Sequence, residues 1–228
     1  MAISNNSRTR IKKVFEPIAL GMGRLGLTPD ALTLIGFAIT VVGAVLVAQQ
    51  LWLAGGVVIL FGGIFDMFDG TLARATGRVS NLGAFMDSVF DRAGEVIVYL
   101  GIVAGLQAIG VADGTLLASA ALGSAVMVSY VRAKSEGLGF TQGTGMAAVG
   151  IMPREVRIVI LSAGLILAGA LGTLPDTSSC PTCVGGAAVG IGTSALFLAL
   201  ALITIGSILT TVQRILHVRS QAKHQATT

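Results

Sequence analysis

The stretch "FDMFDGTLARATGRVSNLGAFMDSVFDR", residues 65–92, lies between two long apolar runs and contains four aspartates: Asp66, Asp69, Asp87 and Asp91. The first two are three residues apart at the end of one run, and the last two are four residues apart at the start of the next. Each pair therefore shares one side of a helix. Because only a short turn would join the helices, the sequence predicts that the four carboxylates meet.

The chain is strongly apolar. Of its 228 residues 54% are hydrophobic and 11% charged, with a mean hydropathy of +0.86, whereas soluble domains are about a quarter charged. Several runs reach about 18–20 residues, enough to cross a bilayer core. We predict an all-α integral membrane protein forming one domain over 1–228, with six transmembrane helices at 31–48, 53–73, 82–108, 115–134, 155–172 and 187–213.

The segment before these runs, residues 8–26, mixes basic residues with apolar ones at helical spacing, interrupted by Pro17. This pattern predicts an amphipathic helix on the membrane surface, ahead of a six-helix bundle over 31–213. The alternative is a solvated basic tail. Thr28-Pro29-Asp30 is typical of a helix start and predicts where the first spanning helix begins.

Basic residues are distributed asymmetrically. All 15 Lys and Arg fall on or near the side that holds both termini and the second-to-third and fourth-to-fifth connections. The positive-inside rule then predicts a multi-pass protein of the bacterial cell membrane, with both termini and the aspartates at the cytoplasmic face. The net charge of +4 does not indicate a nucleic-acid partner, because no basic soluble domain is present.

Four converging carboxylates need positive charge between them. Oxygen ligands without Cys or His favour a hard cation, Mg²⁺ or alternatively Mn²⁺. Four of them can hold two ions about 4 Å apart, as in phosphoryl transfer. The small residues Gly70, Ala73 and Gly83 leave room for a diphosphate. The alternative is that the acids are solvated or paired with neighbouring arginines.

Two other features receive no functional role. Cys180 and Cys183 form a lone "CPTC" in the predicted outer loop, too few ligands for zinc, and an incidental loop with a local disulfide is the simplest interpretation. His217 and His224 lie in the polar C-terminal tail, where we expect them to be solvated.

The pattern Asp66-x-x-Asp69-Gly70-x-x-Ala73-Arg74, eight residues, Gly83-x-x-x-Asp87-x-x-x-Asp91 resembles the signature of the CDP-alcohol phosphatidyltransferase family. The resemblance implies a homodimer of six-helix subunits with an N-terminal surface helix. It also implies an enzyme that transfers the phosphatidyl group of a CDP-linked lipid to an alcohol and releases CMP.

The resemblance also implies roles for individual residues. Asp66, Asp69 and Asp87 would hold one metal ion, and Asp66, Asp87 and Asp91 the second. Asp91 would also take the proton of the attacking hydroxyl. The residues expected to contact the CDP-lipid are Pro29, Asp30, Ala31, Leu32, Gly70, Ala73, Arg74 and Ser80. On residue grounds alone, helix capping by Asp30 and a plain loop hydroxyl for Ser80 are equally good interpretations.

A phosphorylated acceptor would need cations, and candidates stand at the cytoplasmic ends of the later spans: Lys134, Arg154, Arg157, Arg132 and Arg214. The alternative is the ordinary basic collar of a membrane protein. The stretches "LTPDALTLIGFAITVVGA" and "VSYVRAKSEGLG" with "GIMPREVRIVI" resemble bacterial phosphatidylinositol phosphate synthases, which implies CDP-diacylglycerol and inositol 3-phosphate as substrates. Phosphatidylglycerophosphate synthases, which use glycerol 3-phosphate, are the nearest alternative.

Two rival classes also place acids in membrane helices. Membrane prenyltransferases use aspartate motifs, Mg²⁺ and a diphosphate, but they lack the Asp-Gly-x-x-Ala-Arg continuation. Cation transporters usually place such acids near the bilayer midplane, whereas these lie at one helix end beside Arg74 and Arg78.

Overall fold

The computed structural model describes residues 16–140, 149–172 and 191–225. Within these ranges all regular structure is helical, which confirms the all-α prediction. Residues 16–24 form a short first helix. The longer helices are α2 (Pro29–Ala48), α3 (Trp52–Ala75), α4 (Asn81–Ala108), α5 (Ala112–Gly137), α6 (Arg154–Ala170) and α7 (Ile191–Gln225). The first five of these begin and end within three residues of the predicted runs. The last predicted run, 187–213, differs: α7 begins four residues later and ends twelve residues later, so His217 lies in this helix rather than in a tail. Cys180 and Cys183 lie outside the described residues.

Local capping fixes the two helix starts nearest the aspartates. The Thr28 hydroxyl accepts a hydrogen bond from the Ala31 N–H at 3.2 Å, with Pro29 in the first turn of α2. The Ser80 hydroxyl accepts from the Gly83 N–H at 2.9 Å and begins α4. Such caps satisfy amides that a helix start leaves unpaired. The capping role considered for Asp30 therefore belongs to Thr28.

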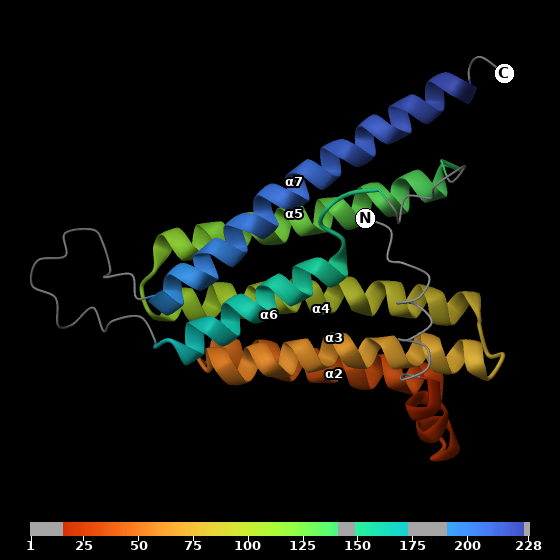
Figure 1. Ribbon diagram of the computed structural model, residues 1–228, viewed down its shortest axis with the longest axis horizontal. Helices are drawn as coiled ribbons and strands as arrows, with labels where there is room; N and C mark the ends of the chain where they lie inside the picture. Colours follow the sequence, from red (N-terminus) through yellow and green to blue (C-terminus); the bar gives the residue numbers. More distant parts are fainter. Residues whose placement is uncertain (1–15, 141–148, 173–190, 226–228) are drawn as a thin grey trace, which may run out of the picture.

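The long helices lie side by side along one axis (Figure 1). The main contacts pair α2 with α3 and α4, α4 with α5, α5 with α7, and α6 with α3 and α7. Small residues allow the close approach, since a Cβ at Gly105 of α4 would come within 2.6 Å of the Val47 carbonyl oxygen of α2. The buried core includes Tyr99, Ile102 and Leu200.

The first helix crosses the bundle steeply near the turn between α3 and α4 (Figure 1). Ala19 is fully buried there, in a small apolar cluster with Leu32, Phe65, Phe68 and Leu72. This position is compatible with the predicted surface helix over 8–26, of which residues 8–15 lie outside the described part of the chain.

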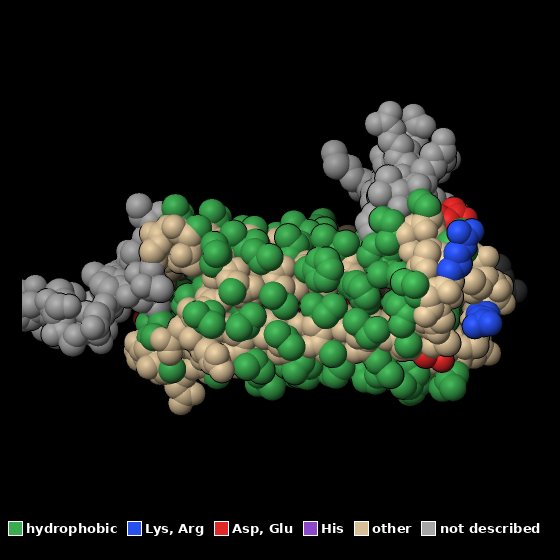
Figure 2. Space-filling view, turned by 90° about the horizontal axis from the view of Figure 1, so that it is seen from below, with side chains coloured by type: hydrophobic (Ala, Val, Ile, Leu, Met, Phe, Trp, Pro, Cys, Tyr) green, Lys and Arg blue, Asp and Glu red, His purple; other side chains and the backbone are tan. Residues whose placement is uncertain are grey.

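Several helices suit a multi-pass membrane protein. In the described part of the chain, four helices are long and apolar enough to cross a membrane: Pro29–Ala48, Trp52–Ala75, Ala112–Gly137 and Gly192–Lys223. Of the other two long helices, α4 carries acids in its first half and α6 has only 17 residues. Hydrophobic side chains cover the length of the face in Figure 2, and charged side chains gather at one end of it.

Candidate active site

The four aspartates lie at the same end of two neighbouring helices, Asp66 and Asp69 on α3 and Asp87 and Asp91 on α4. All four line one cavity of about 430 Å³. The two pairs of aspartates thus meet, as their spacing predicts, because the turn at residues 76–80 brings the end of α3 beside the start of α4.

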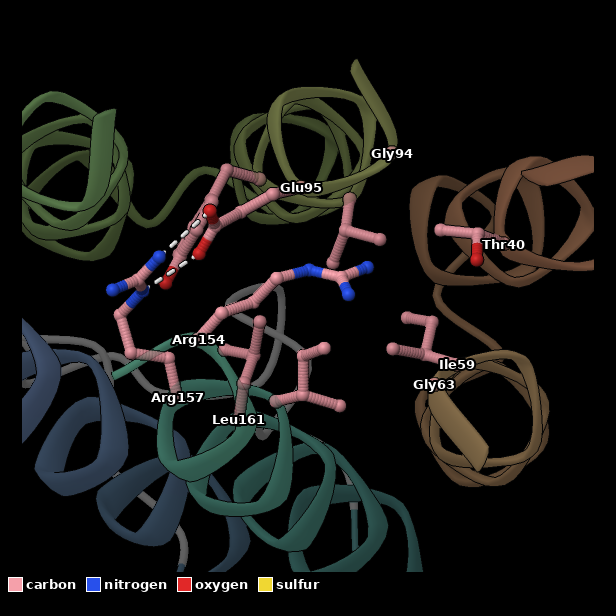
Figure 3. Close-up of a pocket in the computed structure, with 11 residues that line it drawn as sticks. Thr40, Ile59, Gly63, Gly94, Glu95, Arg154, Arg157 and Leu161 are labelled. Carbon is pink, nitrogen blue, oxygen red and sulfur yellow. Dashed lines mark hydrogen bonds and ion pairs between the residues drawn. The ribbon is translucent and has the colours of Figure 1, made fainter. Parts of the chain in front are cut away.

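Arg154, the first residue of α6, joins the two pairs. Its Nη2 lies 2.8 Å from Asp66 Oδ2 and its Nη1 lies 2.8 Å from Asp91 Oδ1. The side chain runs from α6 past Gly94 of α4 toward Thr40 of α2 (Figure 3). Its Nε is buried and finds no hydrogen-bond partner among the described residues. One guanidinium thus balances one carboxylate from each helix.

Asp69 is held differently. Its carboxylate accepts from the Thr33 hydroxyl of α2 at 2.5 Å and from the Gly70 N–H. Asp69 is only 6% exposed, so these donors replace water around a charge that burial alone would disfavour. Thr33 was not among the predicted site residues, although a hydroxyl within an apolar run, directly after the predicted stretch 29–32, was a usable signal.

The donor set fits a divalent cation by type, since it offers carboxylate oxygens from two helices around one cavity. As the side chains stand, no three Asp, Glu, His or Cys residues of the described chain lie close enough to ligate one ion. Arg154 pairs with one carboxylate oxygen each of Asp66 and Asp91, so an ion held by these two acids would share them with the guanidinium.

A second cavity, of about 260 Å³, adjoins the first and shares Asp69 and Asp87 with it. It lies between the start of α2 and the turn from α3 to α4. Six of the eight residues expected at the CDP-lipid line it: Pro29, Asp30, Gly70, Ala73, Arg74 and Ser80. Ala31 and Leu32 do not, and Leu32 is fully buried in the apolar cluster with Ala19.

A third cavity, of about 150 Å³, lies on the other side of Asp91. Arg132, Arg154, Arg157 and Arg214 line it, which brings together four of the five basic residues singled out in the sequence. Lys134 is exposed on α5 and is not part of the lining. These four arginines come from α5, α6 and α7, and Arg92, Glu95 and Glu155 also line the cavity.

Two of these arginines already bind carboxylate or carbonyl oxygens of the protein itself. Arg157, 1% exposed, pairs through Nε and Nη2 with the Glu95 carboxylate at 2.7 and 2.8 Å, and its Nη1 donates to the Met152 carbonyl at 3.0 Å. Arg214 donates to the carbonyls of Val128 and Val149. Both hold helices together, so they differ from the free phosphate-binding cations expected from the sequence.

The other basic residues are less constrained. Arg132 pairs with Glu136 one turn later on α5, at 2.9 Å, where both side chains are exposed. Glu95, the partner of Arg157, was not among the predicted site residues. It stands four residues after Asp91, on the stripe that already carries Asp87 and Asp91, and that continuation was the available signal.

Comparison with known proteins agrees with this geometry. The profile described as CDP-alcohol phosphatidyltransferase matches residues 26–220. The chain belongs to this family of membrane phosphatidyltransferases.

Its relatives include an archaetidylinositol phosphate synthase of Pyrococcus horikoshii, 36% identical over 68% of this chain and 77% of that one. A phosphatidylinositol phosphate synthase of Cutibacterium acnes is 34% identical over 91% of this chain and 93% of that one.

Solved structures lead to the same enzymes. The Mycobacterium tuberculosis phosphatidylinositol phosphate synthase with CDP-DAG bound is 29% identical, has a TM-score of 0.71 and covers 90% of this chain and 94% of its own. The same enzyme in complex with manganese and citrate also has a TM-score of 0.71, over 90% of this chain and 88% of its own.

Proposed function

We propose that this protein is a phosphatidylinositol phosphate synthase, which transfers the phosphatidyl group of CDP-diacylglycerol to inositol 3-phosphate and releases CMP. The observation that carries the proposal is the continuity of three cavities through shared aspartates. Asp69 and Asp87 line both the first and second cavities, and Asp91 lines both the first and third. A nucleotide site and a basic site therefore meet at the acids.

Two of these cavities can each be assigned to one substrate. The second cavity takes the cytidine diphosphate part of the lipid, with Arg74 beside its phosphates and Gly70 leaving room for close approach. The third takes the phosphorylated acceptor, with Arg154 and Arg132 as its cations. Lys134 stays a proposed further contact, two residues after Arg132 on α5. Arg is suited to phosphate because its fork can donate two parallel hydrogen bonds.

In the reaction, the acceptor hydroxyl oxygen forms a bond to the phosphorus that carries the diacylglycerol. The bond from that phosphorus to the bridging oxygen breaks, and CMP leaves with this oxygen and the electron pair. The Asp91 carboxylate accepts the hydroxyl proton, as a general base within reach of the nucleophile. Two divalent ions, Mg²⁺ or Mn²⁺, held by Asp66, Asp69, Asp87 and Asp91, would offset the negative charge of the diphosphate.

The membrane arrangement belongs to the same proposal. All six long helices span the bilayer, with the first helix on the cytoplasmic surface and one domain over 1–228. The acids of α4 are then tolerated because Asp87 and Asp91 line a cavity shared with α3 and α6, where Asp91 pairs with Arg154. Both termini and the active site face the cytoplasm of a bacterial cell, and two copies form a homodimer.

The names of the relatives do not agree on the lipid part of the CDP-linked donor. Archaetidylinositol and phosphatidylinositol phosphate synthases share the inositol phosphate part of their names and differ in the lipid part. The acceptor assignment is thus supported by both groups, and a CDP-archaeol donor is the specific second candidate.

The test is CMP release by purified protein in detergent, with Mg²⁺ and, in parallel, Mn²⁺. CDP-diacylglycerol and CDP-archaeol are each combined with inositol 3-phosphate, glycerol 3-phosphate, free inositol or serine. We expect release with CDP-diacylglycerol and inositol 3-phosphate, abolished in Asp91→Asn. Release with glycerol 3-phosphate alone would keep the mechanism but overturn the acceptor. If none of the four alcohols gives CMP release, the proposal is wrong.

A further inference from the structure

The ion pair between Glu95 and Arg157 lies at the edge of the candidate site, where both residues line the 150 Å³ cavity about one helical turn from Asp91 and Arg154. Both side chains are nearly inaccessible, at 8% and 1% exposure, in a helix bundle of low charge. A buried pair of this kind contributes little net stability compared with apolar residues of the same size. A contribution to packing therefore does not explain why this pair lies beside Asp91 and Arg154.

The pair joins two helices that otherwise have few direct contacts. In the described chain α4 packs mainly on α2 and α5, whereas α6 packs mainly on α3 and α7. A small cavity of about 30 Å³ between them is lined by Glu95, Arg154 and Arg157 (Figure 3). The two ion pairs, from Arg157 to Glu95 and from Arg154 to Asp91, bridge this space.

Arg157 also fixes the start of α6. Its Nη1 donates to the carbonyl of Met152, two residues before Arg154. The Met152 N–H donates in turn to the Thr210 hydroxyl of α7 at 3.0 Å. The chain that leads into Arg154 is thereby held from α4 and from α7 at once.

We propose that Glu95 and Arg157 are positioning residues for the acceptor site: they hold the first turn of α6 against α4 so that the Arg154 guanidinium stays beside Asp91. This inference rests on the proposed function, in which Arg154 receives the acceptor phosphate. Without Glu95, the nearest acid on the same stripe for Arg157 is Asp91, which lines the same 150 Å³ cavity. Arg157 would then compete with Arg154 for Asp91.

The test compares KM values in CMP release. In Glu95→Gln we expect the KM for inositol 3-phosphate to rise about tenfold, the loss typical of one hydrogen bond to a charged group. The KM for CDP-diacylglycerol should change less than about twofold, because the second cavity does not include the pair. Glu16→Gln is the matched control, since it makes the same change at an exposed acid of the first helix that lines none of the three cavities; it should leave both KM values near wild type.

A double-mutant cycle separates positioning from general destabilisation. If Glu95 acts through Arg154, Glu95→Gln should add nothing further to the acceptor KM of Arg154→Gln, whereas independent effects would add. Glu95→Leu combined with Arg157→Met replaces the pair with apolar side chains, a change that buried ion pairs often tolerate. This variant covers the case in which Glu95→Gln does not fold, and we expect it to show the same rise in acceptor KM.

Additive effects in the cycle, equal rises in both KM values, or a wild-type acceptor KM in the apolar double variant would each overturn the positioning role. These outcomes require active wild-type protein, so they are distinct from a failure of the proposed function. If wild-type protein releases no CMP with any phosphorylated acceptor, the proposed function fails and this inference fails with it.

Discussion

At the scale of single residues, Thr33 links α2 to the acid cluster by donating to Asp69. Thr33→Val keeps the side-chain shape and removes the donor. We expect the Mg²⁺ concentration for half-maximal activity to rise about tenfold, the lower end of what losing the partner of a metal ligand costs. The measurement is the initial rate against Mg²⁺ at saturating substrates.

Thr115→Val is the control for this prediction. Thr115 donates to the Val111 carbonyl at the first turn of α5, far along the chain from the acids. Equal Mg²⁺ dependence of the two valine variants would show that the hydroxyl of Thr33 does not support Asp69.

Gly70 offers a second residue-scale prediction. A Cβ added there would lie 3.3 Å from Arg74 Nη1, the flexible end of a side chain, so the fold should tolerate Gly70→Ala. The methyl group would, however, enter the 260 Å³ cavity. We expect unchanged thermal stability and a KM for CDP-diacylglycerol raised about tenfold, equivalent to about 1.4 kcal/mol of lost binding. Gly21→Ala, where a Cβ meets nothing within 4 Å, should change neither quantity.

At the scale of helices, the contact of α2 with α4 depends on glycine. A Cβ at Gly105 would lie 2.6 Å from the Val47 carbonyl oxygen and 2.7 Å from Trp52 Cη2. Because a backbone atom cannot give way, Gly105→Ala should destabilise the protein by about 1–3 kcal/mol. In a detergent-solubilised sample the unfolding midpoint should fall by about 2–4 °C per kcal/mol.

The comparison for Gly105 is Gly123→Ala on α5, where nothing lies within 4 Å of the added Cβ. Alanine is the better helix former by about 1 kcal/mol, so this variant should unfold at the wild-type temperature or slightly above it. A lowered midpoint in Gly123→Ala, or none in Gly105→Ala, would contradict close packing as the cause.

Helix positions were predictable from the sequence because the length of each apolar run and its caps are local properties. The expected run 82–108 became Asn81–Ala108, and 53–73 became Trp52–Ala75. The meeting of the aspartate pairs was predictable for the same reason, since it needs only helical periodicity and a short turn. The partner of Arg157 was not, because spacing along α6 does not say which acid on α4 it will face.

At the scale of the whole molecule, charged side chains gather at one end of the face that Figure 2 shows. The proposed orientation predicts that the turn between α2 and α3 and the end of α7 lie on opposite sides of the membrane. In a background with Cys180→Ser and Cys183→Ser, Gln49→Cys should react with a membrane-impermeant maleimide on intact cells. Ser220→Cys should react only after permeabilisation. Labelling of both, or the reverse order, would contradict the proposed topology.

The acids stand where the apolar length of the bundle gives way to its charged end, and this position has a kinetic consequence. The proposed donor, CDP-diacylglycerol, diffuses in the plane of the membrane, whereas CMP and the proposed acceptor, inositol 3-phosphate, diffuse through the aqueous volume. The rate in a bilayer should therefore follow the mole fraction of the nucleotide lipid among the other lipids, and the volume of the suspension should not affect it. For the phosphorylated acceptor, the rate should follow its concentration in the aqueous volume. Diluting the donor with other lipids and diluting the acceptor with buffer should therefore change the rate independently.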